Sequence, residues 1–399
     1  MFRLGSSFSP AIAAHTATSA LGAGRDAHRR ALLENRSGLR PNDFPHAPLA
    51  CWIGRVEGVE AVALPPALAD WSCRNNRLAW LGLQQDGFLD AVAAVRERVG
   101  ARRVATVMGT STSSIGETEQ AYRELDADGR FPEALARPIV HTPHSIGDFV
   151  QRALALEGPA ITVATACSSS AKVFAQAARL IRAGVVDAAV VGGVDTLCGS
   201  VLYGFNSLEL VSSEPCRPFD AERRGLSLGE AAGYALLVRP DLADAPLRLA
   251  GCGESSDAHH MSSPHPEGLG AELAMREALQ AAGIAPADVG YINCHGTATP
   301  ANDRVEAAVV ARMFPESVHA SSTKGWTGHT LGAAGALEAV VALLALEHGE
   351  LPGTLNARTL DAACGPQIRT GAARAQVGYA LSTSFGFGGN NCALVFGHA

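Results

Sequence analysis

The sequence predicts an α/β fold with two sheet-containing halves, and three observations support that prediction. The chain is long, at 399 residues, which is two or three domains' worth at roughly 150 residues per domain. Its composition suits a large core, because 47% of the residues are hydrophobic and 18% are charged. Short apolar runs also alternate with Ala- and Leu-rich helical patterns along the chain. These features exclude a disordered or coiled-coil protein, and a net charge of −7 gives no overall attraction to nucleic acid.

The expected strands and helices follow one another in a regular order. Strands are expected at 104–108, 161–164, 188–191, 247–249, 289–294, 318–321, 378–383 and 392–396. Helices are expected at 87–99, 171–183, 271–282, 305–314 and 333–348. This succession favours largely parallel, buried sheets, with the last two strands antiparallel. A polar, proline-containing stretch at 239–246 marks the boundary, so we expect domains at 1–242 and 243–399.

Composition and spacing also bear on compartment and metals. The nine cysteines are odd in number and form no CxxC pair, which favours reduced thiols in a cytosol. Pro10 and His15 interrupt the N-terminal stretch, and the apolar run 339–346 is far shorter than the ~20 residues that span a bilayer. We therefore expect a soluble, cytoplasmic protein that does not enter a membrane. No histidine or cysteine cluster has a second pair at zinc-site spacing, so we expect no metal.

A cysteine stands where a predicted strand meets a predicted helix. In the stretch ITVATACSSS, at 161–170, a β-rich run ends in small residues around Cys167, and an amphipathic helical pattern follows until Gly184. The thiol would lie at a helix N-terminus, where unpaired backbone N–H groups favour a thiolate and can hold an oxyanion. This placement predicts a nucleophile. The alternative is a small buried residue, as most free cysteines are.

Two histidines and one of the only two lysines provide further candidates. In YINCHGTATPANDRVE, at 291–306, a strand delivers His295 into a loop of small hydroxyl residues, which is typical of a catalytic imidazole, although a structural histidine fits equally well. In SSTKGWTGHTLGAAGALE, Lys324 lies five residues before His329 in a glycine-rich loop. A nearby lysine keeps an imidazole neutral, so two neutral rings could polarise one thioester carbonyl. A phosphate-binding loop is the alternative, but the order GxxxxGK followed by Ser or Thr is absent.

A glycine-rich segment near the C-terminus holds two phenylalanines. In STSFGFGGNN, at 382–391, glycines and small residues surround Phe385 and Phe387 in a connection between strands. The simpler interpretation is a hairpin with core aromatics. The sharper one is a mobile aromatic gate over a pocket, with glycine hinges.

Together these four segments resemble the β-ketoacyl-acyl-carrier-protein synthases, the elongating condensing enzymes of the thiolase superfamily. The resemblance rests on TACSSSA, CHGTATPAND, STKGWTGHTLGAAGALE and SFGFGGNN, in that order, and weaker similarity extends over nearly the whole chain. It implies a thiolase-like five-layer αβαβα fold, made of two similar halves and assembled as a dimer with an identical or related subunit. It also implies an acyltransferase that joins an acyl chain to a malonyl unit by decarboxylative Claisen condensation, in fatty acid, polyketide or polyene synthesis.

The resemblance carries roles to particular residues. Cys167 matches the nucleophile that accepts the acyl chain. His295 and His329 match the pair that assists decarboxylation and holds the thioester oxygen. Lys324 matches the lysine that orients this pair, and Glu338 is its expected partner.

Supporting residues are implied in the same way. Asp303 and Glu306 match acidic residues that support the His295 loop. Phe387 matches the gating phenylalanine, whose N–H forms the oxyanion hole with that of Cys167. The remaining candidates are a second gate residue and four substrate-binding residues: Phe385, Thr297, Thr299, Thr112 and Phe205. Thr297 and Thr299 match threonines that bind the phosphopantetheine arm.

The expected partner is an acyl-carrier protein, which brings the substrates on its phosphopantetheine, and no other cofactor is expected. Carrier proteins of this class are acidic, so a basic patch should surround the tunnel entrance, with Arg74, Arg77, Arg102 and Arg103 as candidates. At Thr112 the family often has glycine or isoleucine. The absence of a bulky residue there suggests an open, somewhat polar tunnel and a long or unsaturated substrate, as in an aryl-polyene-like pathway.

Other classes fit less well. A non-catalytic chain-length-factor-like partner would lack the nucleophile. A degradative thiolase would need a second active-site cysteine, and neither Cys364 nor Cys392 has that context. An initiating synthase would need asparagine at position 329. A pure interaction module has no reason to carry all four motifs.

Overall fold

Two halves of the chain repeat one five-stranded arrangement in the computed structural model, which describes residues 8–399. The first half has the order β1 (Ala11–Ser19), β9 (Ala231–Val238), β7 (Ala188–Asp195), β5 (Val104–Gly109) and β6 (Ala160–Val163). The second has the order β10 (Leu247–Ser256), β16 (Asn390–His398), β15 (Tyr379–Gly386), β11 (Val289–Asn293) and β12 (His319–Ser321). The two sheets are paired with each other at one place, where Ala11 of β1 lies opposite Arg248 of β10. This pairing joins strands from both sides of the expected boundary at 242/243, so the sheet does not mark where one domain ends. The division there stays a prediction.

Each half is a mixed sheet. In the first half β5 runs parallel to β6 and β7, whereas β9 is antiparallel to β7 and β1. The second half repeats this pattern, with β15 and β16 antiparallel as expected. The α/β class is therefore confirmed, but only half of the pairings within each sheet are parallel. In the first half, β1 and β9, which the apolar runs did not reveal, add the antiparallel pairs; in the second half, β16 is antiparallel to β10 as well as to β15.

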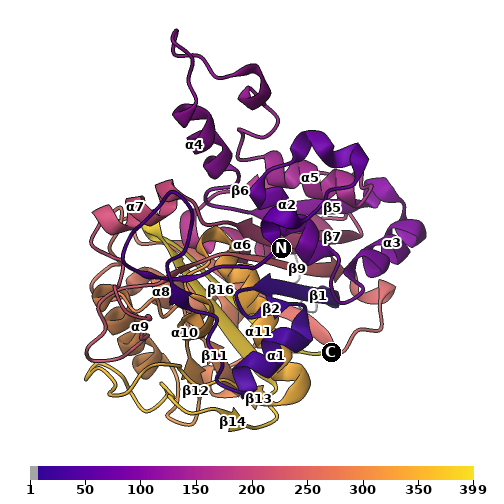
Figure 1. Cartoon of the computed structure of the whole chain (residues 1–399). Helices are drawn as coiled ribbons and strands as arrows, with labels where there is room; N and C mark the ends of the chain where they lie inside the picture. The colour runs from indigo at the N-terminus through magenta and orange to yellow at the C-terminus, as the bar shows by residue number, and fades with distance from the viewer. Residues whose placement is uncertain (1–7) are drawn as a thin grey trace.

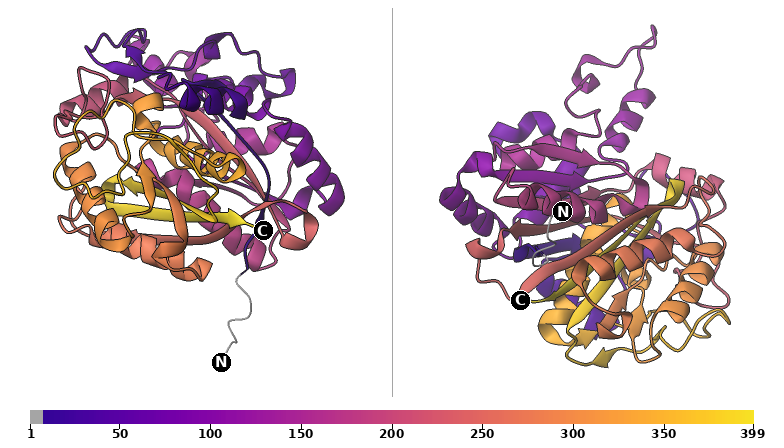
Figure 2. Two further views of the ribbon diagram at one scale, coloured as in Figure 1. Left: turned by 90° about the horizontal axis from the view of Figure 1, so that it is seen from below. Right: turned by 180° about the vertical axis from the view of Figure 1, so that it is seen from behind.

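Helices form three layers around the two sheets (Figures 1 and 2). The middle layer contains α6 (Ser169–Arg182) and α11 (Ala334–His348). The outer layers contain α2 (Arg74–Leu83), α3 (Phe88–Val99) and α5 (Ser145–Ala153) on the first half, and α8 (Leu269–Ala282) and α9 (Pro300–Met313) on the second. The order of layers is therefore αβαβα.

Shorter elements complete the chain. The helices are α1 (Arg25–Leu33), α4 (Ile115–Arg123), α7 (Gly199–Ser207) and α10 (Lys324–Thr327). The short strands are β2 (Gly22–Ala23), β3 (Arg40–Pro41), β4 (Trp52–Gly54), β8 (Leu228–Gly229), β13 (Glu350–Leu351) and β14 (Ala373–Arg374). The 3-10 turns that matter for the site are η5 (Ala166–Ser168), η8 (Leu331–Ala333) and η9 (Phe387–Gly389). α4 belongs to an arm that projects from the body (Figure 1).

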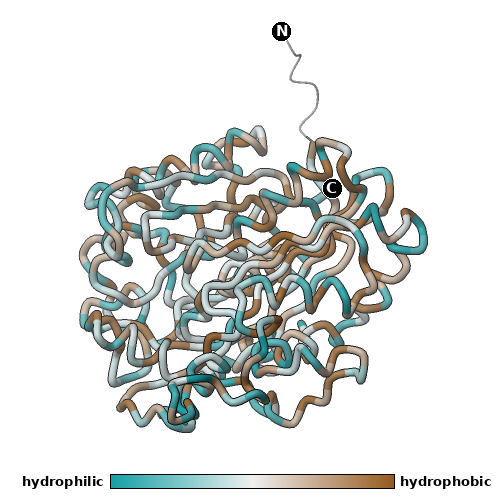
Figure 3. Tube along the Cα trace, turned by 90° about the horizontal axis from the view of Figure 1, so that it is seen from above, coloured by the Kyte–Doolittle hydropathy of each residue, from teal (hydrophilic) through white to brown (hydrophobic). Residues whose placement is uncertain are grey.

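The middle layer explains why α11 is so apolar. The stretch Leu331–His348 is long and apolar enough to cross a membrane by composition, yet 89% of it is buried inside the protein. Leu343 of α11 and Phe174 of α6 are fully buried in one core with residues of both sheets. Burying such a side chain contributes roughly 1.5–3 kcal/mol. Figure 3 shows the same pattern, with hydrophobic segments concentrated in the central strands.

The fold brings distant loops together at one edge. The chain turns into a loop at the C-terminal ends of β5, β6, β11 and β12, and hydrogen bonds join these loops across the two halves. Two expected boundaries are wrong at this edge. α9 begins at Pro300 rather than at 305, and Phe385 lies in β15 rather than in the connection.

Candidate active site

Cys167 lies in η5, immediately before α6, at the helix end that the sequence predicted. Its side chain is buried. Burial raises the pKa of the Cys167 thiol to about 12, although the Lys324 charge and the backbone N–H of Phe387 act in the opposite direction. The expected resting thiolate is therefore wrong, because loss of solvent outweighs the favourable charges. A base must take the proton before the sulfur can attack.

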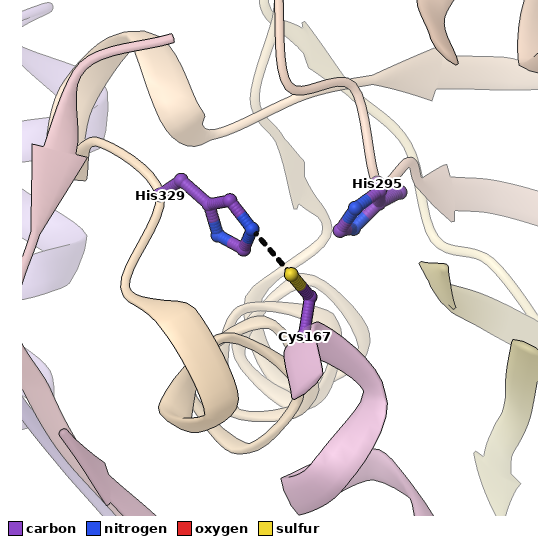
Figure 4. A group of neighbouring side chains, drawn as sticks. All are labelled: Cys167, His295 and His329. Atoms are coloured by element: carbon purple, nitrogen blue, oxygen red, sulfur yellow. Dashed lines mark hydrogen bonds between the residues drawn. The ribbon is translucent and has the colours of Figure 1, made fainter. Parts of the chain in front are cut away.

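Two imidazoles face the sulfur from the other half of the chain (Figure 4). The Nε2 atom of His329 lies 2.9 Å from the Sγ atom of Cys167. The ring of His295 stands 5.4 Å from that of His329, at an interplanar angle of 89°. Both histidines are buried. The three sequence candidates thus meet at one point, with His329 in contact with the thiol.

The imidazoles are held in their neutral form. Burial lowers the pKa of His329 and of His295 well below the usual value, and the Lys324 charge lowers both further. The sequence predicted the effect of Lys324 on the histidine pKa values but not the effect of burial. Lys324 Nζ lies 3.5 Å from His295 Nδ1, so an ammonium donor leaves the ring proton on Nε2, facing the sulfur. The Nδ1 atom of His329 is buried and makes no hydrogen bond to the described residues. The proton of the His329 ring can therefore sit on either nitrogen.

Lys324 is itself anchored from two sides. Its Nζ donates to the Oε1 atom of Glu338 and to the backbone carbonyl of His295. Both charged groups are buried. Burial raises the pKa of Glu338 to about 7, against the opposing effect of Lys324. The ion pair connects the His295 loop to α11.

Two buried carboxylates hold the backbone of the His295 loop. Glu306 accepts from the N–H groups of His295 at 2.8 Å and Gly296 at 2.7 Å. Asp303 accepts from the N–H groups of Ala298 at 3.1 Å and of Phe219 at 2.7 Å. Ala298 has a φ of 68°, which a non-glycine residue adopts only when its surroundings hold it there. The carboxylates therefore fix the loop and leave the imidazole side chain free.

A cavity of about 300 Å³ opens onto the three reacting side chains. Phe385 packs edge-on against His295, with ring centroids 5.7 Å apart. Phe387 stacks on Phe205, with ring centroids 5.7 Å apart, and both rings line the cavity. The Oγ1 atoms of Thr297 and Thr299 lie 2.9 Å apart in the cavity wall. These five residues therefore surround one space, as a gate and a substrate channel require.

Thr112 lies elsewhere. It is not among the residues that line the cavity, and its Oγ1 donates to Asp195 at 2.9 Å. The neighbouring Ser111 hydroxyl also donates to Asp195, at 3.0 Å. The hydroxyls of Ser111 and Thr112 are thus both bonded to a buried carboxylate. A substrate-binding role for Thr112 stays a prediction.

The four arginines proposed for a basic entrance do not line this cavity either. Arg74 pairs with Glu60 and Glu230, and Arg77 binds backbone and hydroxyl oxygens beside it. Two others, Arg102 and Arg103, pair with Glu157 and Asp187. Single arginines in a sequence do not reveal which carboxylates they will meet after folding.

Several residues of the site are not evident from the sequence. The loop 257–264 contributes Asp257, His260 and Ser262 to the cavity, and its Met261 carbonyl accepts from Gly388 N–H at 2.7 Å, next to Phe387. In the sequence the histidine clusters are candidates only for metal ligands, a role that their spacing argues against, so the sequence does not indicate this loop. Asp195 is a further residue that the motifs do not indicate. The only sequence signal for it is a charged residue that ends an apolar strand, AAVVGGVD.

The site contains metal-type ligands that spacing could not reveal. The ligand atoms of Cys167, His295 and His329 all lie within 4.8 Å of one another. A thiolate and two imidazoles are ligands that zinc accepts. The same atoms, however, lie next to the Lys324 ammonium, whose charge opposes a divalent cation.

Comparisons with known proteins agree with this geometry. Family models described as the N-terminal and C-terminal domains of β-ketoacyl synthase match residues 77–243 and 247–358. Nodulation protein E of Rhizobium meliloti (strain 1021) is 36% identical over 306 residues, which are 74% of this chain and 76% of that protein. The mitochondrial 3-oxoacyl-[acyl-carrier-protein] synthase of Arabidopsis thaliana is 38% identical over 260 residues, or 60% of this chain and 56% of that protein.

Solved structures show the same likeness. A chain from the complex of the ketosynthase ApeO with its chain length factor ApeC, from Xenorhabdus doucetiae, superposes with a TM-score of 0.89. That chain is 39% identical, and the match covers 100% of both chains. A β-ketoacyl synthase from Burkholderia phymatum STM815 is 28% identical with a TM-score of 0.88, over 98% of this chain and 100% of that one.

Proposed function

The chain belongs to the β-ketoacyl synthase family, the acyl-transferring condensing enzymes of fatty acid and polyketide synthesis, and on that premise we propose how its residues divide the reaction. The acyl chain is held on Cys167. A malonyl unit on an acyl-carrier protein supplies two carbons after loss of CO₂. The observation that carries this proposal is the 2.9 Å contact between His329 Nε2 and the Cys167 sulfur, in a site where both imidazoles are neutral.

Acyl transfer is the first step. A thiol with a pKa of about 12 stays protonated at neutral pH, so Nε2 of His329 takes its proton as the sulfur attacks the thioester carbonyl. The oxyanion is stabilised by the N–H groups of Cys167 and Phe387, which already lower the pKa of this thiol. Collapse breaks the carbon–sulfur bond to the carrier, whose sulfur receives the proton from His329. The products are acyl-Cys167 and free carrier thiol.

Condensation is the second step. The malonyl thioester oxygen accepts from His295 Nε2–H, and from His329 in its Nε2–H tautomer, which its unbonded Nδ1 permits. Breaking the bond to the carboxylate releases CO₂ and leaves an enolate whose charge these donors stabilise. The enolate carbon then attacks the acyl carbonyl, its negative charge passes to the Cys167 sulfur as the carbon–sulfur bond breaks, and the thiolate takes up one proton from solvent. The β-ketoacyl product stays on the carrier.

Neither step calls on a metal or redox cofactor, and we propose that the cysteine and both histidines work without one. Cys167 acts as a nucleophile and the histidines as proton carriers and donors, so a bound cation would occupy the atoms that the reaction uses. The substrates arrive on phosphopantetheine. Its amides and hydroxyl suit the paired hydroxyls of Thr297 and Thr299 in the cavity wall.

Assembly with a second subunit has its own support. β6 is the edge strand of the first half, and all four of its residues are partly exposed. An open edge offers unpaired backbone groups to another chain. The neighbouring arm and α7 expose Tyr122 and Tyr203, at 64% and 44%. A similar chain is known in a complex of a ketosynthase with its chain length factor. We therefore propose a homodimer or a heterodimer with a related subunit, in the cytoplasm.

The test is intact mass measurement of the purified chain with acyl-loaded carrier protein, followed by malonyl-loaded carrier protein. We expect an acyl adduct, then a β-ketoacyl product on the carrier. Cys167→Ala should form neither, and Cys51→Ala, which alters a buried cysteine outside the cavity, should form both.

An adduct without product would indicate that a partner subunit is required. No adduct with any chain would overturn the proposal and favour the chain-length-factor-like alternative. Offering saturated and polyunsaturated acyl chains of several lengths in the same assay tests the preference for long or unsaturated substrates. Transfer rates that fall steeply beyond short saturated acyl chains, together with no transfer of polyenoyl chains, would contradict this preference.

A further inference from the structure

Asp195, at the end of β7, collects an unusual set of donors for a carboxylate that touches no cation. Its side chain is fully buried. It accepts from the hydroxyls of Thr110, Ser111 and Thr112, and from backbone N–H groups of Ser111 at 2.9 Å and Thr112 at 3.1 Å. It also accepts from the N–H of Gly332 at 2.6 Å. The first donors lie in the loop after β5, and the last lies three residues after His329.

The carboxylate therefore joins two segments that come from different halves. Gly332 sits directly on the loop after β5, because a Cβ built there would lie 2.5 Å from Ser111 N and 2.7 Å from Asp195 Oδ2. Leu331, between Gly332 and the histidine, has a φ of 58°. Such a backbone conformation persists only when its surroundings hold it. Asp195 supplies one of the bonds that do so.

His329 depends on its backbone for its position. A histidine in a catalytic site is usually oriented by a hydrogen bond to its second ring nitrogen. Here Nδ1 has no partner within residues 8–399. The backbone of His329 is bonded on one side, where its N–H donates to Ser227 O at 2.7 Å and its carbonyl accepts from Gly229 N–H at 2.9 Å. On the other side, the bond from Gly332 to Asp195 is the anchor.

From this arrangement we infer that Asp195 is a positioning residue: it fixes the segment after His329, and through it holds the imidazole against the Cys167 sulfur. The inference rests on the proposed function, in which that contact carries the proton of acyl transfer. The inference goes beyond the proposed function, because it adds a residue that touches neither the substrate nor the reacting atoms. Asp195 also acts at a distance on the thiol, since its charge raises the pKa of Cys167.

The test compares Asp195→Asn with Asp220→Asn. Asp220 is equally buried and accepts three backbone N–H groups, but none of them belongs to the segments that carry Cys167 or His329. Both variants should lose thermal stability. Only Asp195→Asn should slow acyl transfer to Cys167, by about tenfold to hundredfold, since its amide turns donor hydrogens toward N–H groups. KM for acyl-loaded carrier should stay within about threefold of wild type, because the cavity wall is unchanged.

A second readout needs no substrate. The rate at which iodoacetamide alkylates Cys167 is followed against pH, and its midpoint should move to lower pH in Asp195→Asn, because a negative charge near the thiol is removed. It should not move in Asp220→Asn. Unchanged acyl transfer together with an unchanged midpoint would overturn the inference. Failure of wild-type acyl transfer would instead overturn the proposed function, and a crystal structure of Asp195→Asn would then decide the inference: a His329 Nε2 atom still 2.9 Å from the Cys167 sulfur would overturn it.

A milder variant covers the case in which Asp195→Asn does not fold. Ser111→Ala combined with Thr112→Val removes two hydroxyl donors, and also the Ser111 oxygen that lies 3.3 Å from Gly332 N, while the carboxylate remains. Acyl transfer should fall about threefold to tenfold. A rate equal to that of wild type would count against the inference.

Discussion

After β5, in the first half of the molecule, the chain enters a loop at 110–113; after β11, at the equivalent place in the second half, it enters a loop at 294–299. Both loops follow a strand that runs parallel to both of its neighbours, and both reach the active-site edge. In both, buried carboxylates accept from the backbone N–H groups, Asp195 in the first case and Glu306 with Asp303 in the second. The two loops are built by one rule.

They differ in what remains after the backbone is fixed. In the loop after β5 the side chains themselves donate to Asp195, so Thr110, Ser111 and Thr112 are used up in holding the loop. In the loop after β11, residues 294–299 donate only backbone N–H groups to the carboxylates, and the ring of His295 faces the sulfur. The fold offers the same position twice, and the side chain presented there decides whether it performs chemistry.

The largest effect is expected when the imidazole is removed from the loop after β11. His295→Ala should reduce condensation from a preformed acyl-enzyme by about 10³-fold, the loss typical when one oxyanion donor is removed. Acyl transfer should fall much less, because His329 contacts the sulfur. Single-turnover assays of the two steps measure this split. A condensation rate within tenfold of wild type would show that the loop after β11 is not the chemically distinct one.

The next effect comes from loosening that loop while its histidine stays. Glu306→Gln keeps the size of the side chain but points an amide toward the N–H groups of His295 and Gly296. Condensation should fall about tenfold to hundredfold, as for other residues that orient a reacting group. Glu230→Gln is a matched control, since this buried glutamate also accepts from two backbone N–H groups, those of Val56 and Leu197, but it lies outside the His295 loop and the cavity. If both variants keep the wild-type rate, the carboxylate does not position the imidazole.

The two loops also differ in how much of their role could be predicted from the sequence. Cys167, His295, Lys324 and His329 stand in motifs of distinctive order, so the sequence alone is enough to select these four residues, which the structure brings together. It is not enough for Asp195 or for the role of Thr112, because a carboxylate and its donors lie 82 or more residues apart and no local pattern joins them. The antiparallel strands β1 and β9 escape prediction likewise, as their pairing is formed only in the folded sheet. Burial of Cys167, which sets its acidity, is also a property of the fold alone.

A smaller effect is expected from pH, and it tests whether the reactive histidines are neutral. The lowered pKa values of His295 and His329 keep both rings unprotonated as the pH falls through 6.5. Acyl transfer at pH 6 should therefore stay within about twofold of the rate at pH 7.5, whereas an ordinary histidine would cost about fourfold. The same shift makes the unfolded chain bind more protons below pH 6.5, so the free energy of unfolding should fall there. A rate that halves near pH 6.5 would contradict the neutral pair.

The smallest effect is expected from the loop that does no chemistry. Thr112→Val removes one of the hydroxyls on Asp195 and leaves the shape of the side chain and the other donors in place. Because Thr112 does not line the cavity, the rates with short and long acyl chains should fall alike and by less than about threefold. Measuring acyl transfer with both chains separates the two interpretations of this residue. If the ratio of the two rates changes severalfold, Thr112 contacts the acyl chain, and the first loop takes part in substrate selection after all.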